Sequence, residues 1–212
     1  MNQLTVGGLS AVAEASRPNQ RLQAKRRTRE KILAAARQLF AERGYEASTI
    51  RDIAKAAGMS TGAVFASFTD KSDLFTEIAE AEQADLYHAM QAAADGLAGK
   101  DAILAMLEAA TQRQCGAIAL VQAVMSALWT PGLAEKARRR LDRRPVSALI
   151  SAAVRQAFAD DARVDATFIG ELIWDSYLAT LRRAALGGLT ADAAKSRIEA
   201  GVLTILSGAQ PN

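Results

Sequence analysis

Two short helical patterns joined by a glycine, within residues 49–71, constrain the fold of this chain more than any other segment. Thr49 and Asp52 have the spacing of a capping box, which predicts that a helix begins at Ile50. Gly58 follows the last apolar position of that helix, where a left-handed residue is needed and glycine adopts it at low cost. The segment is therefore typical of a helix-turn-helix, a motif whose second helix lies in the major groove of DNA.

Helix-forming signals continue after the glycine. Ser60 can cap the second helix of the motif, and we expect Val64, Phe65 and Phe68 to form its buried face. Asp70 can cap the helix that follows. An ordinary pair of antiparallel helices would share much of this pattern, but the close spacing of the turn and the basic residues on both sides favour the DNA-binding motif.

Charge is distributed unevenly along the chain, although the net charge is only +3. Residues 1–75 carry 12 lysine and arginine residues against 7 aspartate and glutamate residues, whereas the remaining residues carry 14 against 16. A basic N-terminal part on a nearly neutral body is the electrostatic pattern of a DNA-binding head.

The composition favours an all-α fold. The 212 residues include only 4 prolines, and runs in which β-branched residues alternate with polar ones are rare. The single cysteine, Cys115, excludes an internal disulfide and suits a reducing compartment, so we expect a cytoplasmic protein. No stretch of 18 consecutive apolar residues is present, so we expect no membrane span.

Residues that could carry catalysis are few. His88 is the only histidine, and it lies 27 positions before Cys115 on a different predicted helix. A catalytic Cys–His pair stays open, but no third group positions it. The sequence contains no phosphate-binding loop, no nucleotide-binding glycine pattern and no Gly-x-Ser-x-Gly turn. We therefore expect neither an enzyme nor a cofactor, and no metal site.

Apolar periodicity and breakers divide the chain into parts. Residues 1–24 are expected to be a disordered leader, residues 25–72 a helix-turn-helix domain and residues 73–212 a larger helical body. Helices are expected over residues 28–43, 50–57, 61–67, 71–95, 101–114, 117–129, 133–159, 165–186 and 191–207. Pro145 predicts a kink or a restart within the span 133–159.

Several segments between residues 27 and 75 match one known family: Ile32–Phe40, Gly44–Tyr45, Thr49–Gly58, Ser60–Phe68 and Lys71–Phe75. On these segments the chain resembles the TetR/AcrR family of transcriptional regulators. The resemblance implies an all-α fold with an N-terminal three-helix DNA-binding head. It also implies a larger C-terminal regulatory domain, here residues 73–212, which binds a ligand and dimerises.

The resemblance implies roles for individual residues of the head. Thr49 matches a phosphate contact made through its hydroxyl and the amides of a helix N-terminus, Thr61 begins the part that reaches base edges, and Lys71 matches a phosphate-binding lysine. Phe65 and Ser67 stand where the family often has tyrosine and histidine. With two arginines from the basic run before the first helix, the expected DNA contacts are Arg26, Arg27, Thr49, Ser60, Thr61, Gly62, Ala63, Phe65, Ser67 and Lys71.

The expected DNA-recognition surface has few hydrogen-bonding side chains. No Arg, Lys, Asn or Gln lies between Thr61 and Phe68, so the side chains that make bidentate contacts with bases are missing from this helix. We therefore expect specificity to depend on van der Waals contacts, DNA shape and the basic run at 21–29. That run is either a solvated helix start or an arm along phosphates or the minor groove. A second arginine run, at 138–144, is expected to be a solvated face, with a further nucleic-acid surface as the alternative.

The body carries large apolar and amphipathic side chains that are candidates for lining a ligand pocket: Met106, Met125, Trp129, Phe158, Trp174 and Tyr177. At helical spacing the same residues can simply form core. The resemblance implies a homodimer through the helices near 165–186 and 191–207, which carry apolar stripes. Two heads would then read an inverted repeat in double-stranded DNA.

These observations together predict a ligand-responsive repressor. We expect it to bind an inverted-repeat operator as a homodimer and to be released by a small apolar or amphipathic effector, whose identity the sequence does not record. The alternative is a helical ligand carrier or enzyme with a vestigial DNA-binding head. Ligand turnover without DNA binding would favour that alternative.

Overall fold

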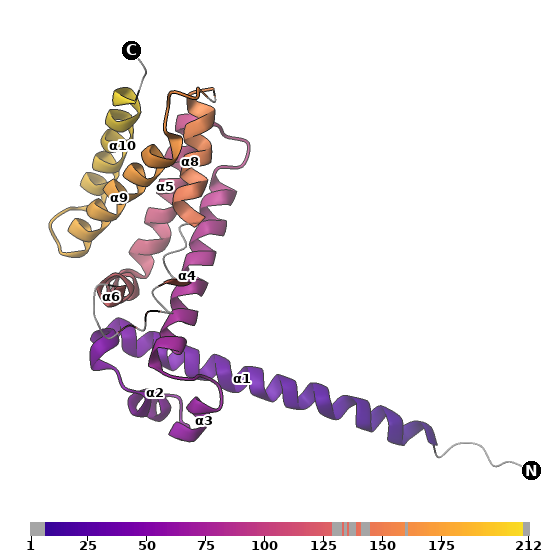
Figure 1. Cartoon of the computed structure of the whole chain (residues 1–212). Coiled ribbons are helices and arrows are strands. Elements are labelled where there is room, and N and C mark those ends of the chain that lie inside the picture. Colours follow the sequence, from indigo (N-terminus) through magenta and orange to yellow (C-terminus); the bar gives the residue numbers. More distant parts are fainter. Residues whose placement is uncertain are drawn as a thin grey trace, which may run out of the picture.

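Helices account for all regular structure in the part of the chain that the computed structural model describes, residues 7–128, 133, 135, 139–140, 145–159 and 161–209. In chain order they are α1 (Gly7–Ala47), α2 (Ile50–Ala56), α3 (Thr61–Phe65), α4 (Lys71–Ala93), α5 (Gly99–Gly116), α6 (Ile118–Leu128), α8 (Pro145–Ala157), α9 (Ala166–Ala185) and α10 (Ala191–Gly208). The expected all-α fold is confirmed. Figure 1 shows α2 and α3 beside α1 at one end, α5, α8, α9 and α10 at the other, and α4 running between them.

The predicted helix starts in the head are confirmed by their hydrogen bonds. The Thr49 hydroxyl accepts from the amide of Asp52 at 3.1 Å, and the Asp52 carboxylate accepts from the Thr49 amide at 3.3 Å, which completes a capping box before α2. Ser60 and Asp70 cap α3 and α4 by accepting from amides three residues ahead, at 3.2 and 2.8 Å. Gly58, between α2 and α3, has a φ of +68°, the left-handed conformation that the turn was expected to need.

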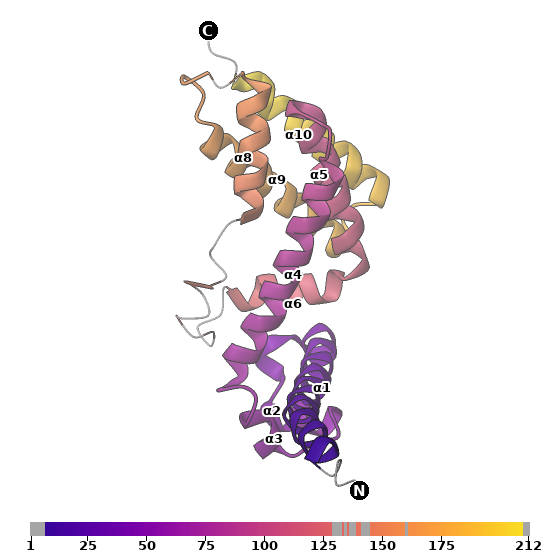
Figure 2. The ribbon, with the colours of Figure 1, turned by 90° about the vertical axis from the view of Figure 1, so that its right-hand side faces the viewer.

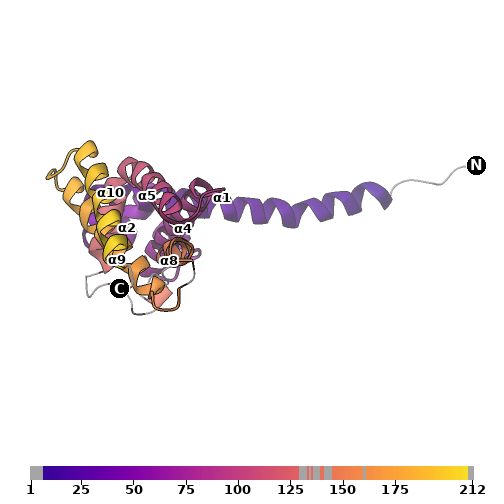
Figure 3. The same cartoon turned by 90° about the horizontal axis from the view of Figure 1, so that it is seen from above.

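α1 is longer than the sequence predicts, since it begins at Gly7, inside the segment 1–24 that was expected to be a disordered leader. α1 starts at Gly7 and continues through Pro18, although that proline lacks a backbone donor. Residues 20–27 are all exposed to solvent. They are arginine, lysine, leucine, glutamine and alanine, which favour helix without tertiary contacts. Figure 3 shows this end of α1 projecting away from the other helices.

The C-terminal end of α1 folds back onto α4. Gly44 leaves the helical conformation with a φ of 80°, which agrees with the predicted end of the first helix near residue 43. Tyr45 is then buried, with its ring centroid 4.7 Å from that of Phe75 and 5.8 Å from that of Phe40. Its hydroxyl lies 2.9 Å from the Ser72 hydroxyl. These contacts join α1 firmly to the first turns of α4.

One hydrophobic core fills the head and extends beyond its expected border at residue 72. It takes in α4 as far as Ala79, and it also takes in side chains of α6 that pack on α1. The buried members beyond residue 72 are Leu74, Phe75, Ile78, Ala79, Leu120, Ala123, Ala127 and Leu133. α4 and α6 are therefore shared between the head and the body, as Figure 2 shows for α6 lying across α4 above α1.

A second core fills the body, between the far half of α4 and helices α5, α8, α9 and α10. α8 and α9 approach each other closely at Gly170, where an added Cβ would lie 2.2 Å from the Ser151 hydroxyl oxygen. α8 begins at Pro145, which is the restart that the sequence predicts and suits the first turn of a helix. No helix among the described residues is long and apolar enough to cross a membrane.

Candidate nucleic-acid interface

The start of α3 is exposed to solvent. Thr61 and Gly62 are exposed and Ala63 is half-buried, whereas Val64 faces the core and is fully buried. The prediction that Phe65 belongs to the buried face is wrong, because 56% of its surface is exposed. Val64 and the buried Phe68 lie four positions apart and occupy the inner side, so the intervening Phe65 points outward.

The N-terminus of α2 is held by the Thr49 capping box. The Thr49 hydroxyl donates to Asp52 at 2.6 Å while it accepts from the Asp52 amide, so its proton is already used inside the motif. The same bond, with a smaller contribution from the Thr49 amide, lowers the pKa of the Asp52 carboxyl. A phosphate at this helix end would therefore meet the free backbone amides more readily than the hydroxyl.

Lys71 is half-buried at the start of α4. Its ammonium donates to the carbonyl oxygens of Tyr45 at 2.9 Å and Glu46 at 3.3 Å, and it lies 4.2 Å from the centre of the Tyr45 ring. The lysine thus caps the carbonyl end of α1 from the neighbouring helix. An ammonium has three donors, so one proton stays available for a phosphate.

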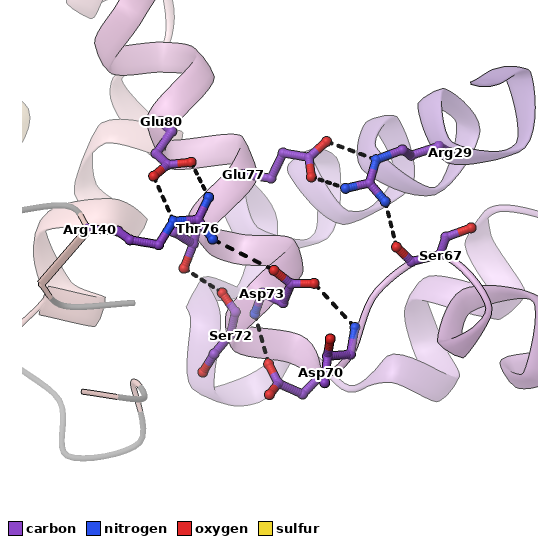
Figure 4. A network of polar contacts seen from close by, with 10 residues as sticks. Arg29, Ser67, Asp70, Ser72, Asp73, Thr76, Glu77, Glu80 and Arg140 are labelled. Atoms are coloured by element: carbon purple, nitrogen blue, oxygen red, sulfur yellow. Dashed lines mark hydrogen bonds and ion pairs between the residues drawn. The ribbon is translucent and has the colours of Figure 1, made fainter. Parts of the chain in front are cut away.

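The basic run on α1 contains residues in two different situations. Arg26 and Arg27 are exposed, and within the described residues neither has a hydrogen-bond or ion-pair partner. Arg29, by contrast, is bonded to Glu77 of α4 and to the backbone carbonyl of Ser67 after α3, as Figure 4 shows. Arg29 therefore connects the basic run of α1 to α4 and to the segment after α3.

Two cations of α2 were missed by the sequence analysis. Arg51 and Lys55 are exposed and lie one turn apart on the first helix of the motif, the helix that crosses the DNA backbone in a helix-turn-helix. The spacing of four positions between two cations on a predicted helix could have identified them from the sequence.

Of the other predicted DNA contacts, Ser60 is exposed and Ser67 is half-buried beyond the end of α3.

The predicted ligand-pocket residues are divided between core and surface. Met106 and Tyr177 are buried in the second core, and Trp174 stacks on Tyr177 with ring centroids 4.9 Å apart. The Tyr177 hydroxyl donates to Gln114 at 2.6 Å. Phe158 is half-buried and lines a surface pocket at the connection between α8 and α9.

The other two pocket candidates contribute less. Met125 is half-buried on α6 and belongs to neither buried cluster. Trp129 lies outside the described residues.

Cys115, the remaining candidate for covalent chemistry, is exposed. No group of three or more His, Cys, Asp or Glu side chains among the described residues could hold a metal ion.

The second arginine run is not simply a solvated face. Arg140 donates in bidentate fashion to Glu80 of α4, with Asp73 3.8 Å away, and this pairing raises the pKa of the guanidinium. Arg139 pairs within its own turn with Glu135 at 2.9 Å. Arg138, Arg143 and Arg144 lie outside the described residues.

Comparisons with known proteins place the head in a recognised group. A family model described as "Bacterial regulatory proteins, tetR family" matches residues 32–78. The HTH-type transcriptional regulator AcrR of Shigella flexneri is 44% identical over 59 residues, which are 28% of this chain and 27% of that protein. The HTH-type transcriptional repressor AcnR of Corynebacterium glutamicum is 46% identical over 57 residues, which are 27% of this chain and 30% of that protein. The chain thus matches less than a third of the length of these relatives.

Solved structures extend the likeness to the whole fold. The fatty acid degradation regulator FadR from Bacillus halodurans superposes with a TM-score of 0.71 at 14% identity, over 87% of this chain and 97% of that one. Thermus thermophilus FadR, a repressor solved in complex with lauroyl-CoA, superposes with a TM-score of 0.66 at 21% identity, over 87% of this chain and 96% of that one. At these identities the likeness concerns the fold alone.

Proposed function

Because the head of this chain matches the tetR family of bacterial regulatory proteins, we propose that the chain is a repressor that binds an inverted-repeat operator as a homodimer and leaves it when a small apolar or amphipathic effector binds the body. The curated relatives named as repressors match the head, where DNA would be bound.

The observation that carries the proposal is the exposed start of α3. Thr61 and Gly62 present small side chains and accessible backbone, and α2, which packs against α3, carries the exposed cations Arg51 and Lys55. Small groups on the second helix allow close approach to base edges, while cations on the first helix neutralise phosphates. Sequence recognition would then depend on van der Waals contacts from Ala63 and Phe65 and on DNA shape.

A homodimer through α9 and α10 would bring two heads onto one duplex. Phe168 and Leu172 lie one turn apart on α9 and are exposed, as is Leu203 on α10. Leu181 and Val202 are buried in the chain's own core, and Leu178, Ile198 and Ile205 are half-buried against it. The exposed set forms the apolar surface that we assign to the dimer.

The proposed effector site lies in the second core. Met106, Trp174 and Tyr177 meet there, and the Tyr177 hydroxyl and Gln114 offer a polar pair beside an aromatic stack. A protein of this fold can accommodate an amphipathic ligand, since T. thermophilus FadR was solved in complex with lauroyl-CoA. An effector that separates these side chains would act on α4, whose far half packs in the same core.

Selection of duplexes from a random-sequence pool by the purified full-length protein tests the proposal. We expect an inverted repeat whose half-sites lie about 34–36 Å apart or a multiple of that distance, and an affinity that falls with salt with a log-log slope of several units. Failure to enrich any sequence, or binding that salt does not weaken, would contradict a DNA-binding function. Turnover of a small molecule by the same preparation would instead favour the helical carrier or enzyme.

A further inference from the structure

The end of the recognition helix is fixed by one side chain from another element. Arg29 of α1 donates from its Nε to the Glu77 carboxylate at 3.1 Å, and one terminal nitrogen bonds the other oxygen of the same carboxylate. Its second terminal nitrogen donates to the backbone carbonyl of Ser67. The guanidinium also lies over the Phe68 ring, 4.1 Å from its centre. Figure 4 shows Arg29 reaching Glu77 on one side and Ser67 on the other.

This contact matters because α3 has little else to hold it. The helix has only 5 residues, too few to be stable on its own. Its first turn is fixed by the Ser60 cap, and its inner face by the buried Val64. Beyond its last turn, the Ser67 carbonyl is an acceptor that no helical amide serves, and Arg29 satisfies it.

Because the DNA-facing surface of α3 lacks long polar side chains, sequence recognition depends strongly on where α3 lies. Contacts from side chains such as Ala63 and Phe65 are van der Waals contacts, and a radial gap of about 0.5–1 Å already forfeits a quarter to a half of such a contact. Long polar side chains could adjust to a displaced helix, but residues 61–68 have none. Small shifts of α3 should therefore weaken sequence recognition strongly.

The charge of Arg29 is directed inward, unlike that of its neighbours. Glu77 neutralises it at hydrogen-bond distance, whereas Arg26 and Arg27 have no partner in the part of the chain that the structure describes. Phosphate attraction should therefore depend on Arg26 and Arg27 rather than on Arg29.

We propose that Arg29 is a positioning residue for the recognition helix: it clamps the Ser67 carbonyl to Glu77 and so sets the position of α3, without contacting DNA. This inference rests on the proposed DNA-binding function for its consequence, but the clamp itself can be measured without DNA. The effect of Arg29 on α3 and its effect on DNA binding are therefore tested by two separate measurements.

The first readout is hydrogen exchange in the full-length protein. Arg29→Met keeps an apolar stem over Phe68 and removes both hydrogen-bond connections. We expect the amides of residues 61–68 to exchange about ten-fold faster than in the wild type, with little change in the far half of α4. Arg27→Met, from the exposed part of the run, should leave these amides unchanged. Unchanged exchange at residues 61–68 in Arg29→Met would overturn the proposal.

The second readout is binding to a duplex selected by the wild-type protein, compared with a scrambled duplex of equal length and composition. Arg29→Met should lose about ten-fold or more in affinity for the selected duplex and keep its affinity for the scrambled one, with an unchanged salt slope. Arg27→Met should weaken both alike and reduce the slope by about one. The opposite assignment, a reduced slope in Arg29→Met, would make Arg29 a phosphate contact and end the proposal.

A double variant separates placement from stability. Arg29→Met alone leaves the half-buried Glu77 carboxylate unpaired, which destabilises the fold for reasons unrelated to α3. Arg29→Met with Glu77→Met removes both charges and should recover the unfolding free energy, yet it should still bind the selected duplex weakly. If the double variant recovered both the unfolding free energy and the affinity for the selected duplex, the ion pair between Arg29 and Glu77 would be purely structural. If the wild type selects no duplex, the proposed function fails, and the exchange experiment alone decides the clamp.

Discussion

At the scale of single residues, Gly170 shows how closely α8 and α9 pack. A Cβ on Gly170 would lie 2.2 Å from the Ser151 hydroxyl and 2.8 Å from its backbone nitrogen. Gly170→Ala should therefore force the helices apart and cost about 1–3 kcal/mol of unfolding free energy, measured by urea denaturation. Gly208→Ala, where nothing lies within 4 Å, is the matched control and should be nearly neutral.

A second substitution sharpens that prediction. Adding Ser151→Ala removes the hydroxyl but leaves the backbone nitrogen and the Cα, which stays at 2.9 Å from the new Cβ. The double variant should therefore recover only part of the lost free energy. Full recovery would show that the serine hydroxyl, and not the backbone approach, makes glycine necessary.

Tyr177 predicts how stability depends on alkaline pH. Burial raises the pKa of its phenol well above the ordinary value of about 10. Above that pH the unfolded chain loses this proton while the folded chain keeps it, so stability falls as the pH rises. Tyr177→Phe removes the group and should show a shallower decline between pH 9 and 11 in urea denaturation. At pH 7 it should lose about 0.5–1.5 kcal/mol through the missing bond to Gln114.

An equal pH dependence for the two proteins would show that Tyr177 already ionises normally in the folded state. The comparison is restricted to the difference between wild type and Tyr177→Phe, because lysines and other tyrosines contribute equally to both curves.

Single residues also show where sequence reasoning reaches its limit. The caps at Thr49, Ser60 and Asp70 were predicted and are confirmed, because each depends on residues three positions apart. The bonds of Arg29 and Lys71 could not be predicted, because their partners lie 25 to 48 positions away. Lys71 was expected to bind phosphate because of the family resemblance, and Arg29 belonged to a basic run expected to be either a solvated helix start or a DNA-binding arm, whereas both side chains make hydrogen bonds inside the head.

At the scale of elements, the shortness of α3 makes its N-cap decisive. Ser60 accepts from the Ala63 amide at 3.2 Å, and it was also predicted to contact DNA. Ser60→Ala should cost about 0.5–2 kcal/mol of unfolding free energy and should weaken binding to the selected duplex. Ser60→Asp keeps a good cap and should retain stability, but its negative charge faces the phosphates and should reduce affinity.

The pair of Ser60 variants distinguishes two roles for one residue. Urea denaturation measures the unfolding free energy, which reports on the cap. Fluorescence anisotropy with the selected duplex measures the affinity, which reports on the DNA contact. Retained affinity in Ser60→Asp would place Ser60 away from the phosphates and leave it the structural role alone.

Among the elements, α4 was the hardest to interpret from sequence. Its N-terminus and its length were predicted closely, with an expected span of 71–95 against Lys71–Ala93. The partners of its carboxylates could not be predicted from the sequence. In the structure Glu77, Glu80 and Asp85 pair with arginines of α1, of the segment before α8 and of α5. Exposed pairs of this kind each add little stability, so their more important effect is to fix α4 against its neighbours.

At the scale of the whole molecule, the head and body are less separate than the sequence suggested. A border near residue 72 was expected, because the helix-turn-helix pattern ends there. The first core instead continues along α4 to Ala79 and includes Leu120, Ala123 and Ala127 of α6. Apolar periodicity identifies a helix and its buried face, but it does not say which core that face enters. A signal from the body would therefore reach the head through packed side chains of both α4 and α6.

Assembly is the remaining property of the whole molecule, and in the proposed homodimer it depends on the exposed faces of α9 and α10. Leu172 is 42% exposed beside Phe168, one turn away. A glutamate there would bury a charge in an apolar interface, which is costly without a partner. Leu172→Glu should therefore yield monomers in sedimentation at micromolar concentration. Leu97→Glu, at a similarly exposed leucine (46%) in the turn between α4 and α5, should leave the dimer intact.

The same pair of variants links assembly to DNA binding. One head reads one half-site, so a monomer should bind a half-site duplex as well as the wild type does but lose the added affinity for the full inverted repeat. That added affinity can reach about 10²–10⁴-fold when the spacing of the heads fits the duplex. Leu172→Glu protein that remains dimeric would move the interface elsewhere. A monomer with unchanged affinity for the full repeat would mean that the two heads bind independently.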